Sequence, residues 1–306
     1  MSVILFLNLK GGVAKTTTTI AVAETLAEAK QRVLVIDTDH QCAASELLLG
    51  DERLLRADQR RRTLHDLLAA MLREDFTTDQ FDRFVEWGGS NINGGYPHLG
   101  VLPCSLRMEE FSSNRARAME NYYSAEEFNA VLRKHEAMLH RWLRNSFDYV
   151  LVDCPPTIPF QVKTMLKVAD AYLVPSVPDQ LSVKGSHHLI ERIRRLGITK
   201  AKPLGLLWTL YRESNTVHKR TVSRSLQGEV LHPVLPAPLR TILPNATAIA
   251  RVSEQQSVAP QSVAGKYGTQ FGQLFKNVVS EIQGRLQVLE VANKTGAKKA
   301  LSMLRQ

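Results

Sequence analysis

Residues Lys10 to Thr19 read KGGVAKTTTT, a glycine-rich stretch that ends in a lysine followed by threonines. The standard phosphate-binding loop, G-x-x-x-x-G-K-[ST], has glycine where this chain has Leu9 and Ala14. An apolar run at 3–9 predicts a buried strand before the stretch, and a Thr- and Ala-rich pattern at 16–29 predicts a helix after it. Strand, loop and helix in this order favour a phosphate site. We expect Ala14 to start the helix, where alanine is tolerated.

The residues after the first glycines have the chemistry that a nucleoside triphosphate and its metal ion require. Gly11 and Gly12 let successive N–H groups point at phosphate oxygens, and the helix start adds its positive dipole end. Lys15 supplies a cation for the β- and γ-phosphates, Thr16 can ligate Mg²⁺, and Thr17 can reach the α-phosphate. The residues expected to contact the nucleotide are Lys10, Gly11, Gly12, Val13, Ala14, Lys15, Thr16 and Thr17.

Short apolar runs alternate with helical stretches along the chain, as in βαβ units. The runs are nearly continuous in hydrophobicity, which is typical of strands buried on both faces of a parallel sheet. They lie at 3–9, 33–37, 99–103, 149–153, 172–177, 204–210 and 230–235. We therefore predict an α/β fold of the P-loop NTPase type: a mainly parallel, twisted sheet with helices on both faces, whose ligands bind at the carboxyl edge.

Length and composition suit one large α/β domain or two small ones, since the chain has 306 residues and is 44% hydrophobic. We predict a single domain at 1–284 that includes a mostly helical, polar segment at 51–147. Residues 285–306 have few large apolar side chains and several basic ones, so we expect a helix or tail there.

The start of the chain and its cysteines indicate a cytoplasmic protein. The first apolar run is about seven residues long and has no basic head, so it predicts neither a signal peptide nor a membrane span. Cys42, Cys104 and Cys154 are widely spaced and form no C-x-x-C pair. This spacing argues against a disulfide framework and against a zinc or iron–sulfur site.

Acidic residues end two of the predicted strands. DTDHQ (37–41) follows VLVID, and YVLVDCPP (149–156) contains the second strand end. Together with NLKGGVAKTTTT, whose loop resembles the deviant P-loop K-G-G-x-x-K-[ST]-T, these segments resemble the ParA and MinD ATPases. The resemblance implies an ATPase that binds ATP and Mg²⁺. It also implies that Lys10 reaches across a dimer interface to the partner's phosphates, and a second ammonium beside Lys15 does need a further anion.

The resemblance also assigns roles to the two acids. DTDHQ is similar to the family's D-x-D-P-Q switch, which implies that Asp39 lies near the attacking water and the Mg²⁺ shell. His40 replaces the usual proline, so we expect a less rigid switch. Asp153 matches the second acidic strand end and is implied to support Mg²⁺ through water. The expected catalytic residues are Lys10, Lys15 and Asp39, and the expected metal-site residues are Thr16, Asp39 and Asp153.

The net charge of +9 is concentrated between Lys184 and Arg224, where the sequence has ten basic residues and only two acidic ones. Such a surface favours phosphate backbones or anionic lipid, although a charge run can also be a solvated face without a partner. Partition ATPases of the ParA type bind DNA without sequence preference, through basic residues of the carboxyl half. The resemblance thus implies DNA contacts by Arg192, Arg194, Arg195, Lys219, Arg220 and Arg224.

Our main hypothesis is a ParA-type partition ATPase. The resemblance of the chain to this family implies an ATP-dependent homodimer that binds nonspecific double-stranded DNA on the nucleoid. It also implies that the dimer is released when a ParB-like adaptor stimulates hydrolysis. One alternative is a MinD-like membrane ATPase, but the tail at 298–306 has little apolar area, so we expect no membrane partner. Another is a ParA-like positioner of a protein cargo, which uses the same chemistry.

Overall fold

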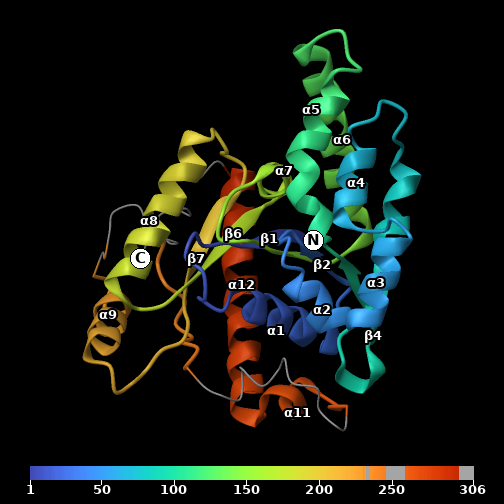
Figure 1. Ribbon diagram of the computed structural model, residues 1–306. Coiled ribbons are helices and arrows are strands. Elements are labelled where there is room, and N and C mark those ends of the chain that lie inside the picture. The colour runs from blue at the N-terminus through green and yellow to red at the C-terminus, as the bar shows by residue number, and fades with distance from the viewer. Residues whose placement is uncertain (230, 232–234, 246–258, 296–306) are drawn as a thin grey trace.

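The fold is a twisted seven-stranded sheet between two layers of helices, seen in a computed structural model that describes residues 1–229, 231, 235–245 and 259–295 (Figure 1). The strand order is β3-β4-β2-β5-β1-β6-β7, and all neighbours are parallel except β3 and β4. The strands are β1 (Ser2–Phe6), β2 (Val33–Asp37), β3 (Glu86–Gly89), β4 (Tyr96–Leu102), β5 (Tyr149–Asp153), β6 (Ala171–Ser176) and β7 (Lys202–Trp208). The structure confirms the predicted P-loop fold class.

Alternate residues of each central strand face opposite layers, because side chains of a strand alternate in direction. Val3, Leu5 and Leu7 belong to one buried cluster, while Ile4 and Phe6 belong to the other. Both faces are apolar, which explains why the strands read as continuous hydrophobic runs. The sequence therefore specifies a sheet that must be covered on both sides.

One layer of helices packs around the first helix of the chain. It contains α1 (Lys15–Glu28), α2 (Ala43–Leu49), α11 (Val263–Tyr267) and α12 (Thr269–Thr295). Figure 1 shows the long α12 beside α1, so the two ends of the chain build the same layer. Helix α12 runs without a break through residue 284, and Leu289 and Ala292 beyond it are buried. The division into 1–284 and 285–306 stays a prediction.

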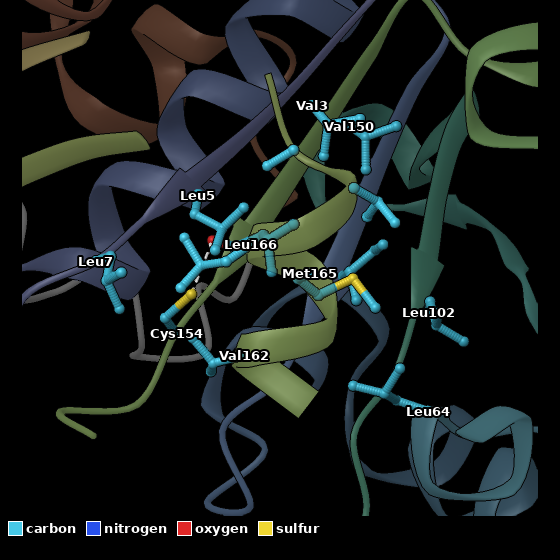
Figure 2. Packing of buried hydrophobic residues seen from close by; sticks show 14 of the residues in the cluster. Val3, Leu5, Leu7, Leu64, Leu102, Val150, Cys154, Val162, Met165 and Leu166 are labelled. Atoms are coloured by element: carbon cyan, nitrogen blue, oxygen red, sulfur yellow. Dashed lines mark hydrogen bonds between the residues drawn. The ribbon is translucent and has the colours of Figure 1, made fainter. Parts of the chain in front are cut away.

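The second layer covers the opposite face with helices of the middle of the chain. They are α4 (Leu64–Ala70), α5 (Phe111–Met119), α6 (Ala125–Ser146), α7 (Phe160–Val168) and α8 (Gln180–Arg195). Figure 2 shows Val162, Met165 and Leu166 of α7 packed toward Leu5 and Val150 of the sheet. This packing fixes α7 over the strands whose ends form the site.

The remaining elements are short and lie toward the edges. They are α3 (Asp51–Gln59), α9 (Thr216–Leu226) and the 3₁₀ turns η1 (Thr78–Phe84), η2 (Ile92–Gly94) and η3 (Leu106–Glu110). The segment 51–147 is mostly helical, as the sequence suggests, but it also holds the antiparallel edge strand β3, whose EWGG sequence gave no alternating pattern. Arg53 donates hydrogen bonds from α3 to the carbonyls of Trp87 and Gly88 in β3.

Some predicted elements end at other residues in the structure, or fall outside the residues that it describes. The first strand stops at Phe6, not at Leu9, because Asn8 turns the chain: its amide donates to the carbonyl of Pro175 at 2.7 Å. Residues 230 and 232–234 of the strand predicted at 230–235 lie outside the described residues, as does the tail at 298–306. In the part of the chain that is described, no helix is both long and apolar enough to cross a membrane.

Candidate nucleotide site and basic surface

The predicted phosphate loop leaves β1 and curls before α1 through two residues with positive φ. Gly12 has φ 67°, which glycine adopts without strain. Ala14 has φ 58° and ψ 34°, and α1 begins only at Lys15. Our expectation that Ala14 starts the helix in a helical conformation is wrong: it is left-handed, a conformation that costs a residue with a Cβ about 1–2 kcal/mol. The standard motif has glycine at this position.

Lys10 is held within its own subunit by the start of α8. Its ammonium donates to Asp179 at 3.1 Å and to the hydroxyl of Ser182 at 2.8 Å. Asp179 also caps α8, since its carboxylate accepts the Ser182 N–H at 2.7 Å. Burial alone would raise the pKa of Asp179, but the Ser182 N–H and the Lys10 ammonium together lower it. The side chain of Lys10 is 36% exposed.

Lys15 lies buried at the base of the loop. Its ammonium donates to the carbonyl of Lys10 at 3.1 Å, and its residue exposure is 7%. Burial lowers its pKa, while the charges of Asp153 and Asp39 oppose that shift. Desolvation of an ammonium is costly unless an anion compensates it. A phosphate oxygen would supply this compensation.

Asp153 ends β5 directly below the first turn of α1. One carboxylate oxygen accepts a 2.7 Å hydrogen bond from Thr16, and the other lies 3.3 Å from the hydroxyl of Thr19. The residue is fully buried, and desolvation raises its pKa to about 8, helped by the negative charge of Asp37. The structure therefore brings Thr16 and Asp153 together, as the sequence predicts.

Asp37 is a second buried acid that the sequence reasoning did not assign to the site. It lies opposite Asp153 in the register of β2 and β5. Burial raises the pKa of Asp37 to about 6, against the hydrogen bonds that it accepts from the N–H and hydroxyl of Ser45 at 2.9 and 2.6 Å. The VLVID sequence held the signal, because Asp37 is the last residue of a strand that is buried along its whole length.

Asp39 sits in the turn between β2 and α2, near the loop but not in contact with Thr16 or Asp153 through a hydrogen bond. Its carboxylate accepts the Gln41 N–H at 3.1 Å, and its own N–H donates to Asp37 at 3.0 Å. His40, expected to loosen this switch, lies 3.7 Å from Asp39 and 3.3 Å from Glu109 of η3. These contacts lie between the turn and η3.

The donor groups around Lys15 fit Mg²⁺. They are a hydroxyl and carboxylates, which are hard oxygen ligands. The carboxylate of Asp153 is buried next to a second acid, so a divalent cation would relieve an unfavourable charge there. Among the described residues, no group of three or more His, Cys, Asp or Glu side chains could hold a metal alone.

A cavity of about 240 Å³ adjoins the loop on the side of α12. Gly12 and Thr17 line it from the loop, and Leu210, Pro244 and Phe275 supply apolar walls. Asn245 and Thr209 add polar groups, which the sequence reasoning did not single out. The hydroxyl of Thr209 donates to the Val13 carbonyl at 3.0 Å and so joins the loop to the end of β7.

The predicted DNA-binding residues divide into two groups. Arg192, Arg194 and Arg195 are exposed on the carboxyl half of α8, and Arg194 pairs with Glu191 at 3.1 Å. Arg220 and Arg224 of α9 line a groove of about 730 Å³ between α8 and α9, together with Lys184. Arg224 is paired with Glu229. Lys219 is exposed but does not line this groove.

Comparison with known proteins gives both a family match and structural relatives. The profile of a family described as an AAA domain matches residues 1–204, two thirds of the chain. A ParA family protein of Chlamydia trachomatis is 27% identical over 232 residues, which cover 74% of this chain and 79% of the relative.

Two solved structures are similar over almost the whole chain. One is pNOB8 ParA bound to nonspecific DNA, with a TM-score of 0.61, 19% identity and coverage of 94% of this chain and 98% of that one. The other is cobyrinic acid a,c-diamide synthase of Mycobacterium smegmatis with bound ATP analogue and magnesium, with a TM-score of 0.57, 21% identity and coverage of 97% and 98%. At these identities the likeness shows the fold alone.

Proposed function

Because this chain belongs to the ParA/MinD family of deviant Walker A ATPases, we propose that it is a ParA-type partition ATPase. It binds ATP with Mg²⁺, forms a dimer around the nucleotides, coats nonspecific double-stranded DNA and leaves it when a ParB-like adaptor stimulates hydrolysis. The cargo that is segregated is a plasmid or chromosome. The proposed location is the cytoplasm, on the nucleoid.

The observation that carries the ATPase proposal is the group formed by Lys15, Thr16 and Asp153. Among the residues that the structure describes, the buried Lys15 ammonium donates a hydrogen bond only to a carbonyl, and the buried Asp153 accepts one from Thr16, the hydroxyl that is predicted to ligate the metal. Bound ATP and Mg²⁺ would supply the anion and the cation that these two groups lack. In this scheme, Asp39 orients the attacking water and the cavity beside Thr17 accepts the base.

We propose that Lys10 exchanges one anion for another when the dimer forms. Asp179 and Ser182 hold its ammonium in the same subunit, and the phosphates of the partner's ATP would replace them. The exchange starts from a half-exposed ion pair, which contributes only about 0–1 kcal/mol of stability and so opposes release weakly. The α8 cap is retained through the Ser182 N–H.

The proposed DNA surface combines α8 and α9 of both subunits. Lys184 and Arg220 carry charge in the groove, whereas Arg224 and Arg194 are each neutralised by an acid of their own chain. We therefore expect Lys184 and Arg220 to contribute more to phosphate contacts than Arg224 and Arg194. Binding through phosphates falls with salt because counterions are released.

The test of the DNA proposal is binding to a random-sequence duplex with ATP, ADP or no nucleotide across a salt series. We expect binding with ATP only, weakening steeply with salt. Arg220→Ala should reduce the salt slope by about 1 for each lost phosphate contact. Arg133→Ala, in an exposed position on α6, is the matched control. DNA binding that does not depend on ATP, or that does not weaken with salt, would refute partition by this mechanism.

A second test addresses the trans role of Lys10. Lys10→Ala should keep nucleotide binding but lose ATP-driven dimerisation, measured by light scattering, and ATP hydrolysis. Lys163→Ala, at an exposed position of α7, controls for loss of a lysine. Unchanged turnover in Lys10→Ala would contradict the trans role while leaving ATP binding in place.

A further inference from the structure

The cavity beside the phosphate loop is bounded by a segment that runs outside the last strand of the sheet. Residues 237–245, which we call the wall segment, are irregular apart from two isolated bridges, one to β7 and one to the turn after it. The N–H of Leu239 donates to the carbonyl of Leu206 in β7 at 2.7 Å, so the segment begins along this strand. Its last three residues line the cavity: Leu243, Pro244 and Asn245. The shape of the cavity therefore depends on where the wall segment lies.

The middle of the wall segment is held by Glu281 of α12. The Glu281 carboxylate accepts the N–H of Arg240 at 2.6 Å and the N–H of Thr241 at 2.8 Å, and the Thr241 hydroxyl donates to it at 2.6 Å. Hydrogen bonds to an ionised carboxylate are stronger than those between neutral groups. These bonds satisfy two backbone donors that an irregular segment cannot satisfy by itself.

Arg285, one helical turn after Glu281, holds the start of the wall segment. Its guanidinium donates to three backbone carbonyls, in β7 and in the wall segment: those of Leu204 at 2.8 Å, Ala237 at 2.8 Å and Pro238. A side chain in place of Gly205 would obstruct this contact, because a Cβ there would lie 2.3 Å from Nη1 of Arg285. Residues four apart on a helix share a face, so α12 holds the segment with two adjacent side chains.

We propose that Glu281 and Arg285 are positioning residues for the nucleotide base: they hold the wall segment in the place where its last three residues complete the base cavity. The inference rests on the proposed function, in which this cavity accepts the base of ATP. Helix α12 also supplies Phe275 to the same cavity, so one helix sets both a side chain and a segment that bound it. Sequence patterns do not indicate this role, since residue 285 is the first of the predicted tail.

The expected consequence of releasing the wall segment is a weaker affinity for the base without a change at the phosphates. A segment released from α12 would occupy several positions, and the apparent affinity falls with the fraction of molecules in the binding-competent one. If that fraction drops to about one tenth, the Kd for ATP rises about tenfold. Glu281 and Arg285 contact the wall segment and β7, whereas phosphates are expected at the loop of residues 10–17. Binding of inorganic tripolyphosphate should therefore not change.

Two conservative variants of the full-length protein remove the contacts. Arg285→Lys keeps the charge but not the planar fork that reaches three carbonyls, and Glu281→Gln presents an NH₂ group to a backbone N–H. Both should speed hydrogen–deuterium exchange of the wall segment without nucleotide, and leave the exchange of α1 unchanged. Lys276→Met, which removes a half-exposed cation of the same helix, is the matched control. Unchanged exchange of the wall segment in both variants would overturn the proposal.

Binding measurements separate the base from the phosphates. Calorimetric titration in the presence of Mg²⁺ should give both variants a Kd for ATP about tenfold above that of the unaltered protein, and the same Kd for tripolyphosphate. Steady-state hydrolysis should show a raised KM with kcat unchanged, as expected when ground state and transition state are bound equally more weakly. An equal loss of affinity for ATP and tripolyphosphate would refute a role at the base, as would an unchanged affinity for ATP.

The unaltered protein distinguishes a failure of this inference from a failure of the proposed function. If it binds neither ligand, the proposed ATPase function fails. If it binds tripolyphosphate as tightly as ATP, the cavity does not accept the base, and the positioning role fails with it. If it prefers ATP and both variants match it in the Kd for ATP, the proposed function stands and only the role of Glu281 and Arg285 is refuted.

Discussion

Each end of helix α1 has a buried acidic side chain beside it, and the two side chains have different partners. Toward its carboxyl end, Glu24 is fully buried and accepts hydrogen bonds from Lys266 at 2.6 Å, Tyr267 at 2.7 Å and Ser90 at 2.6 Å. At its amino end, Asp153 is equally buried, but within the described parts of the chain its carboxyl group has hydrogen bonds only with threonine hydroxyls, and burial raises its pKa to about 8. A buried acid that is paired with a cation joins elements together, whereas a buried acid without a direct ion pair favours the binding of a cation from outside.

The largest effect should come from breaking the paired end. Lys266→Met leaves Glu24 buried without its cation, and removal of one partner of a buried pair costs about 3–5 kcal/mol. Urea unfolding of the nucleotide-free protein measures this loss. Lys276→Met is the matched control, since Lys276 is half-exposed and 4.0 Å from Glu28, and should cost less than about 1 kcal/mol. If both variants lost a similar amount of unfolding free energy, the buried Lys266–Glu24 pair would stabilise the protein no more than the exposed Lys276–Glu28 pair, which contradicts the prediction.

A smaller and opposite effect should follow from removing the carboxyl group of Asp153, which has no direct ion pair. The pKa of Asp153 is raised to about 8 in the folded protein, above its unfolded value near 4, so the folded state binds this proton more tightly. The carboxyl therefore adds stability below about pH 4 that is lost as the pH rises through 8. Asp153→Asn does not titrate and should escape that loss.

The measurement is the free energy of unfolding of both proteins, without nucleotide or Mg²⁺, from pH 4 to pH 8. We expect Asp153→Asn to be more stable at pH 8 by on the order of 3 kcal/mol, with the difference shrinking toward pH 4. The same variant should lose ATP hydrolysis. A difference that is constant with pH would show that Asp153 is compensated in a way that the contacts of Thr16 and Thr19 do not reveal.

The smallest effect concerns backbone strain, which both ends of α1 carry. Ala14 precedes the helix with φ 58°, and Lys30 follows it with φ 63°. Glycine removes the Cβ conflict at either position, so Ala14→Gly and Lys30→Gly should each add about 0.5–1 kcal/mol after the larger entropy of the unfolded glycine chain. Ala27→Gly, inside the helix, should instead cost about 1 kcal/mol. Thermal unfolding would separate these signs; a loss at Ala14 alone would mean that the alanine side chain has a packing role.

The sequence was sufficient for six of the seven strands and for the residues that meet at the amino end of α1, but not for the edge strand β3 or the left-handed Ala14. The predicted features depend on local sequence patterns: apolar runs, the K-G-G-V-A-K-T loop and an acid at the end of each of two strands. The structure places Lys15, Thr16 and Asp153 together at this end of the helix. The spacing of residues in the sequence could not predict that Asp37 lies beside Asp153. Their closeness follows from the register of β2 and β5, which are neighbours in the sheet.

The carboxyl end of α1 could not be predicted in the same way. Glu24, Ser90 and Lys266 are far apart in the chain, and a glutamate in a helix pattern is most simply interpreted as solvent-exposed. Its burial depends on which helices cover that face, which is a property of the tertiary structure. The partners of Lys10 on α8 could not be predicted for the same reason.

The pairing of Glu24 with Lys266 has a consequence for how the protein is made. A ribosome completes α1 long before it reaches position 266, so the nascent helix carries a carboxylate whose counterion does not yet exist. Desolvation of that carboxylate is unfavourable until Lys266 arrives, so we expect α1 to dock stably on the sheet only then. We therefore expect the loop before α1 to acquire its final shape late in synthesis, after the complete phosphate-loop sequence has long been made.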